Sequence, residues 1–215
     1  MLEVVQGDLW IFGYGSLIWR PAFPYRERHP GYIEGFKRRF WQQSTDHRGT
    51  PEAPGRVVTL LAEPGEVCWG MAYRVADEDR ESVLARLDFR EKGGYQRVYA
   101  DVLLDRDNRI AGRPADPSVR ALVYVATAEN PNYAGPEPIE DIARIVQRAR
   151  GPSGTNLDYV MRLADALQNI GACDPHVIEL ARRACDSLHS EPADAPLDDR
   201  ARGVPAGEPE TSRRR

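Results

Sequence analysis

The order of secondary-structure signals along the chain constrains its fold more than any other feature of the sequence. Short segments rich in aromatic and β-branched residues predict strands, and amphipathic patterns predict helices. The expected strands cover residues 9–14, 33–41, 56–61, 67–75, 95–104 and 121–126, and the expected helices cover 77–89, 138–149, 156–170 and 174–188. Most of the helices follow the last strand, so regular β-α-β alternation is absent. The sequence therefore predicts an α+β fold with a small mixed, barrel-like sheet and flanking helices.

Two local patterns refine this prediction. The segment 121–126 is nearly all apolar, which is typical of a strand buried on both faces. Pro64 and Gly65 lie between the segments 56–61 and 67–75, and we expect them to separate two strands.

The composition changes sharply near residue 190. Residues 190–215 contain four prolines and no aromatic residue. Such a segment buries too little apolar surface to offset the entropy lost on ordering. The length of 215 residues suits one domain with an appended tail. We predict a folded domain over residues 1–189 and a disordered tail over residues 190–215.

The overall composition excludes several classes of function. The chain has 29 Lys and Arg against 33 Asp and Glu, and a net charge of −4 argues against a nucleic-acid-binding surface. No apolar stretch approaches the roughly 18–20 residues that span a bilayer, so no membrane association is expected. The three cysteines and four histidines are scattered without the spacing of metal ligands, so we expect no metal and no cofactor. Unpaired cysteines also fit a reducing cytoplasm.

A glycine-rich segment at the end of the first expected strand is the first candidate site. It reads FGYGSLIW over residues 12–19. Gly13 and Gly15 permit a positive φ or a close approach of the backbone to a ligand. Successive backbone N–H groups in such a turn can bind an anion. Ile18 occupies the third glycine position of the dinucleotide fingerprint, which argues against a nucleotide site.

Two further segments carry groups suited to catalysis or binding. Glu91 lies between a helix end and a strand start, and burial in an apolar cleft would raise its pKa and suit it to acid–base chemistry. Gly93 and Gly94, which follow it, are explained more simply as a helix stop, and composition alone favours that interpretation. Arg38 and Arg39 could pair with a substrate carboxylate. The aromatic residues beside them are compatible with single-stranded nucleic acid, but the acidic chain disfavours that alternative.

Taken together, the motifs resemble one known family. The matching stretches, in order, are FGYGSLIW (12–19), RRFWQ (38–42), STDHRG (44–49), PGRVVTL (54–60), VCWGMAYR (67–74), LDFREKGGY (87–95), NPNYAGP (130–136), EDIA (140–143) and GPSG (151–154). The sequence resembles the ChaC-like γ-glutamylcyclotransferases that act on glutathione. The resemblance covers roughly residues 9–170, and the tail matches nothing.

The resemblance implies a fold, a reaction and a set of residues. The implied fold is an α+β domain around a small β-barrel, and the implied reaction splits glutathione into 5-oxoproline and cysteinylglycine without metal or nucleotide. Glu91 would be the acid–base residue. The implied substrate-binding residues are Ile11, Phe12, Gly13, Tyr14, Gly15, Ser16, Leu17, Arg39 and Tyr159, with Arg56 as an alternative to Arg39. Two alternatives stay open: cyclisation of other γ-glutamyl amines or peptides, and a non-catalytic domain that binds γ-glutamyl compounds.

Overall fold

The computed structural model describes residues 9–91, 94–105 and 118–186. The segment 190–215, which the sequence predicts to be disordered, lies outside the described residues. Within the described part, five strands form a closed barrel in the order β1-β3-β2-β4-β5. They are β1 (Leu9–Gly13), β2 (Glu27–Ser44), β3 (Gly55–Val75), β4 (Gln96–Leu104) and β5 (Ser118–Val125). The parallel pair β1 and β5 closes a sheet whose other pairs are antiparallel, so the predicted mixed, barrel-like sheet is confirmed.

The barrel interior forms the main hydrophobic core. All five residues of β1 are buried, as are residues 121–125 of β5, which confirms the expectation of a strand buried on both faces. Along the second half of β2 the buried side chains Arg38, Phe40, Gln42 and Ser44 alternate with partly exposed ones. This period of two is expected for a strand with one face toward a core.

The region of Pro64 and Gly65 differs from the prediction. The chain runs through them as one long strand, β3, which bends beside β2. The register places Phe36 opposite Ala62 but Glu34 opposite Val67, so extra residues of β3 bulge from the ladder. Gly65 takes a positive φ of +89° there, a backbone conformation that glycine adopts more readily than other residues. The two residues therefore make a bulge rather than a strand break.

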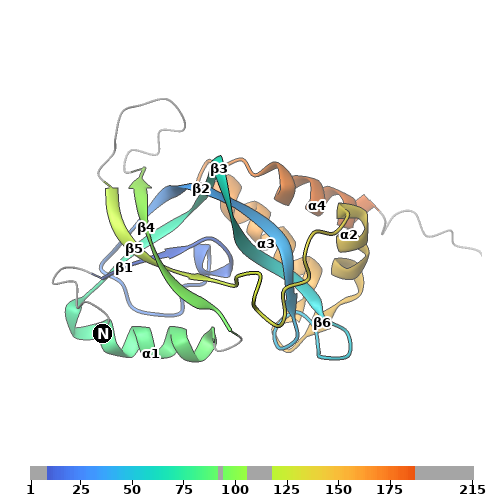
Figure 1. Ribbon diagram of the computed structural model, residues 1–215, viewed down its shortest axis with the longest axis horizontal. Helices are drawn as coiled ribbons and strands as arrows, with labels where there is room; N and C mark the ends of the chain where they lie inside the picture. The colour runs from blue at the N-terminus through green and yellow to red at the C-terminus, as the bar shows by residue number, and fades with distance from the viewer. Residues whose placement is uncertain (1–8, 92–93, 106–117, 187–215) are drawn as a thin grey trace, which may run out of the picture.

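The helices lie outside the barrel. They are α1 (Arg80–Arg90), α2 (Ile139–Arg148), α3 (Asn156–Asn169) and α4 (Pro175–Asp186), and α1 is preceded by the 3₁₀ turn η2 (Asp77–Asp79). Figure 1 shows α2, α3 and α4 grouped beside the far ends of β2 and β3, whereas α1 lies on the other side of the molecule. The expected helical segments are confirmed within a few residues at each described end. No helix in the described ranges is long and apolar enough to cross a membrane.

Local sequence explains where α3 and α4 begin. The Thr155 hydroxyl accepts a hydrogen bond from the backbone N–H of Asp158 at 3.1 Å and so caps α3. Asp174 caps α4 in the same way, because its Oδ1 accepts from the N–H groups of His176 at 3.1 Å and Val177 at 3.2 Å. Pro175 occupies the first turn of α4, where its missing N–H costs nothing.

Candidate active site

A cavity of about 790 Å³ opens beside the barrel. Its wall comes from the turn after β1, the end of β2 and the loop that follows it, the end of α1, and the first half of α3. A volume of this size falls within the roughly 300–1,000 Å³ of small-molecule sites. The predicted residues Phe12, Gly13, Tyr14, Gly15, Ser16, Leu17, Glu91 and Tyr159 all line it.

The glycine-rich turn is built by close packing. After Gly13 the chain enters a single 3₁₀ turn, η1 (Ser16–Ile18), which the Ile18 N–H closes on the Gly15 carbonyl at 3.0 Å. A Cβ on Gly13 would lie 2.5 Å from that of Leu17, a distance real structures do not tolerate. Gly15 has a φ of −121°, so close approach, not a positive φ, explains both glycines.

Tyr159 lies directly against this turn. A Cβ on Gly15 would come within 3.2 Å of the Tyr159 hydroxyl, so a larger residue there would crowd the phenol. Burial raises the pKa of Tyr159 to about 12, and its ring centroid lies 5.6 Å from that of Trp19. The phenol is therefore neutral at physiological pH and can donate a hydrogen bond into the cavity.

Glu91 supplies the cavity with a carboxylate. It follows the last residue of α1, and its backbone N–H binds the Leu87 carbonyl at 2.8 Å. Its side chain is only 16% exposed. This burial raises the pKa of Glu91, an effect that the nearby Arg90 guanidinium opposes and the Asp46 carboxylate reinforces.

Arg90 joins this carboxylate to the glycine-rich turn. Its Nε lies 3.1 Å from Glu91 Oε1, and its terminal nitrogen donates to Ser16 Oγ at 2.6 Å. Arg90 and Ser16 are 74 positions apart in the sequence, and the Arg90 side chain contacts both the turn and Glu91. The arrangement places an acid–base group beside a turn with backbone N–H groups.

A second charged cluster frames the far wall of the cavity. Arg48 donates to Asp158 Oδ2 at 3.0 Å and to the Thr155 carbonyl at 3.0 Å, and its guanidinium lies 5.6 Å from the Tyr159 ring. Arg162 binds the other oxygen of Asp158 at 2.9 Å. These contacts fix the loop after β2 against the first turns of α3.

Three residues expected at the site do not line the cavity. Ile11 is fully buried within the barrel core. Arg39 donates to the Arg38 carbonyl at 2.7 Å, and Arg56 pairs with Glu137 at 3.1 Å. The Arg38 side chain is fully buried as well, so it too is unavailable to a substrate carboxylate.

Several lining residues had no role in the sequence interpretation. They are Arg20, Asp46, Arg48, Arg90, Tyr95 and Asp158. Asp46 and Arg48 lie in the motif STDHRG, and Arg90 and Tyr95 lie in LDFREKGGY, so the motifs mark the right segments. The motifs do not say which of their side chains face one cavity. Within the described ranges, no three His, Cys, Asp or Glu residues are placed to hold a metal ion.

The barrel and its cavity place this protein in the class of γ-glutamylcyclotransferase-like folds. A crystal structure of a yeast γ-glutamylcyclotransferase specific to glutathione superposes with a TM-score of 0.78 at 29% identity, over 84% of this chain and 97% of that one. A family model described as ChaC-like protein matches residues 9–185. The chain belongs to the ChaC-like protein family.

Individual relatives are similar over most of their length. Gamma-glutamylcyclotransferase 2-3 of Arabidopsis thaliana is 48% identical over 179 residues, which cover 81% of this chain and 87% of that protein. Glutathione-specific gamma-glutamylcyclotransferase 1 of Homo sapiens is 46% identical over 173 residues, covering 79% and 75%.

Proposed function

We propose that this protein is a γ-glutamylcyclotransferase that cleaves glutathione into 5-oxoproline and cysteinylglycine. The observation that carries the proposal is the cavity in which Arg90 links a buried carboxylate, Glu91, to the glycine-rich turn. The similarity to the human glutathione-specific gamma-glutamylcyclotransferase 1 supports the choice of substrate.

The reaction needs one carboxylate that acts first as a base and then as an acid. The α-ammonium of the γ-glutamyl group gives a proton to Glu91, and the freed amine nitrogen attacks the carbon of its own side-chain amide. The bond between that carbon and the cysteine nitrogen then breaks as Glu91 returns the proton to the leaving nitrogen. The new ring nitrogen still carries one proton more than the lactam product, and it loses this proton through the same carboxylate to the released amine of cysteinylglycine. No water is consumed, and a carboxyl group of raised pKa is suited to both transfers.

Positioning is the main task, because the nucleophile belongs to the substrate. A well-oriented intramolecular attack can gain about 7–11 kcal/mol over its bimolecular counterpart. Backbone N–H groups of the glycine-rich turn, which lines the cavity, are suited to stabilise the oxyanion that forms on the amide carbonyl. Tyr159, whose hydroxyl lies against the same turn, is proposed to hydrogen-bond the γ-glutamyl group.

The proposed location is the cytoplasm. Cys68, Cys173 and Cys185 form no disulfide among the described residues, and burial raises the pKa of the Cys68 thiol to about 11, which makes it unreactive. Free thiols of this kind fit a reducing compartment.

The direct test is to incubate the full chain at micromolar concentration with millimolar glutathione and to measure 5-oxoproline by mass spectrometry. We expect 5-oxoproline and cysteinylglycine to appear in equal amounts. A panel of γ-glutamyl amines and γ-glutamyl dipeptides, run in parallel, separates a glutathione enzyme from a broader cyclotransferase. Binding of glutathione in a thermal-shift measurement without any product would instead indicate a non-catalytic binding domain.

A further inference from the structure

The cavity carries a small excess of positive charge. Its lining contains four arginines, namely Arg20, Arg48, Arg90 and Arg162, against the three carboxylates of Asp46, Glu91 and Asp158. The whole chain has a net charge of −4, so this excess is local. Glutathione at neutral pH has two carboxylates and one ammonium group, and its net charge of about −1 matches the excess.

Three of these arginines are already committed to partners. Arg90 binds Ser16 and Glu91, and both Arg48 and Arg162 bind Asp158. Arg20 is exposed at the cavity wall and makes no ion pair with any other residue that the structure describes. A guanidinium without a partner beside a cavity is the group best suited to bind an incoming carboxylate.

The position of Arg20 is fixed by the same turn that holds the γ-glutamyl group in the proposed mechanism. Its backbone N–H binds the Ser16 carbonyl at 2.9 Å, and its neighbour Trp19 packs on Tyr159. Arg20 thus enters the cavity wall directly after η1, whereas Glu91 reaches the cavity from the end of α1.

We propose that Arg20 binds the glycine carboxylate of glutathione, at the end of the substrate opposite the γ-glutamyl group. This inference rests on the proposed function and deepens it. An extended cysteinylglycine segment carries that carboxylate about 7 Å beyond the scissile amide, which separates it from Glu91. Arg20 thus distinguishes glutathione from γ-glutamyl amines, which lack this carboxylate.

The test pairs one substitution with one change to the substrate. Wild-type protein, Arg20→Gln and Arg20→Lys are each assayed with glutathione and with glutathione whose glycine carboxylate is converted to a carboxamide. For glutathione, we expect Arg20→Gln to lower kcat/KM about tenfold through KM, with Arg20→Lys intermediate. For the carboxamide, wild type and Arg20→Gln are expected to have equal kcat/KM. Arg120→Gln, an exposed strand arginine outside the cavity, is the matched control and is expected to behave as wild type.

Two outcomes would overturn the inference: an equal loss for both substrates in Arg20→Gln, or no loss for glutathione. Binding, measured as the ligand-induced thermal shift, gives a readout that does not need turnover. If wild-type protein forms no 5-oxoproline, the proposed function fails. The difference in shift between glutathione and its carboxamide, present in wild type and absent in Arg20→Gln, still decides whether Arg20 binds the carboxylate.

Discussion

Glu91 is held between two charges of opposite sign. The Arg90 guanidinium lowers its pKa and the Asp46 carboxylate raises it, while burial contributes the largest effect and leaves the pKa above its usual range. In the proposed mechanism Glu91 must be ionised to accept the first proton. Its pKa therefore sets the acid limb of the pH–rate profile.

Neutralising these two neighbours should move the acid limb in opposite directions. Arg90→Gln removes a favourable charge, so the pKa of Glu91 rises and the acid limb of kcat/KM moves to higher pH. Asp46→Asn removes a repulsive charge, so the limb moves to lower pH. The measurement is kcat/KM for glutathione between pH 4 and pH 9. Shifts of the same sign in both variants would show that the limb does not report Glu91.

Arg38 links the glycine-rich turn to the start of α4. Its side chain is fully buried, its Nε donates to the Tyr14 carbonyl at 2.8 Å, and a terminal nitrogen binds Asp174 Oδ2 at 2.7 Å. The other terminal nitrogen binds the Trp69 carbonyl. Because Asp174 also caps α4, one ion pair fixes both the helix start and the backbone of Tyr14.

Removing the charge of Asp174 should therefore weaken both stability and substrate binding. Asp174→Asn retains a cap oxygen but leaves a buried guanidinium without its counter-ion, which costs about 3 kcal/mol in the free energy of unfolding. We expect KM for glutathione to rise as Tyr14 loses its support. Urea denaturation and steady-state kinetics measure the two effects. Asp186→Asn, at the exposed end of the same helix, is the control and should change neither.

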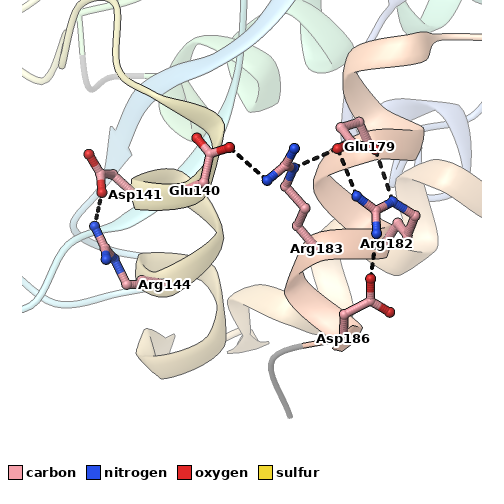
Figure 2. Close-up of polar contacts among 7 residues, drawn as sticks. All are labelled: Glu140, Asp141, Arg144, Glu179, Arg182, Arg183 and Asp186. Carbon is pink, nitrogen blue, oxygen red and sulfur yellow. Dashed lines mark hydrogen bonds and ion pairs between the residues drawn. The ribbon is translucent and has the colours of Figure 1, made fainter. Parts of the chain in front are cut away.

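Helices α2 and α4 are joined by a network of surface charges. Figure 2 shows Arg183 reaching from α4 to Glu140 on α2 while also binding Glu179, which in turn contacts Arg182. Arg182 and Arg183 together lower the pKa of Glu179 to about 2. A depressed pKa means that the network stabilises the fold above the usual glutamate pKa and loses this contribution as the pH falls toward 2.

Glu179→Gln should lower the melting temperature at pH 7 by a small, salt-dependent amount. The difference from wild type should shrink between about pH 4.5 and pH 2, because wild-type Glu179 is then protonated as well. Thermal melts at several pH values, in low and high salt, measure this. A difference independent of both pH and salt would point to lost packing instead of charge.

Most elements could be predicted from the sequence, because their signals are local. The patterns that predict β1, β5 and the helices each depend on residues that lie close together in the sequence. The course of β3 could not be predicted, because Pro64 and Gly65 are compatible with a turn or with a bulge. The partner strand decides between them: Gly35 of β2, with a φ of +76°, bends opposite the same place.

The candidate site was predictable only in its local parts. The glycine-rich turn and Glu91 lie in compact motifs, whereas the pairs Arg90 with Ser16 and Arg48 with Asp158 join residues 74 and 110 positions apart. Pairing at such separations depends on the barrel topology, which a single sequence does not specify. Arg39 was predicted at the site but does not line the cavity. The sequence predicts a strand that ends near Arg39, whereas β2 continues to Ser44, and its alternating pattern turns Arg38 inward and leaves Arg39 partly exposed.

At the level of the whole molecule, a chain with a net charge of −4 does not attract an anionic substrate from a distance. Recognition of glutathione must depend on the positive excess within the cavity. High salt should therefore raise KM for glutathione, because it screens the charges at the site itself and not only the long-range attraction that governs encounter.

The expected boundary between the folded domain, residues 1–189, and residues 190–215 can be tested by truncation. A chain ending at residue 189 should fold and cleave glutathione as the full chain does, within a factor of about two, because residues 190–215 contain too few apolar side chains to contribute to a core. Melting temperature and kcat/KM of the two chains make the comparison. A clear loss on removal of residues 190–215 would show that they pack on the domain.

The central claim is that Glu91 transfers the proton during cyclisation of glutathione. The most direct measurement is the rate of 5-oxoproline formation by Glu91→Gln, a substitution of nearly equal volume, in protein whose circular dichroism and melting temperature match wild type. We predict a fall of about 10²–10⁴-fold in kcat. A rate close to that of wild type would contradict the claim and assign the proton transfer to another group in the cavity.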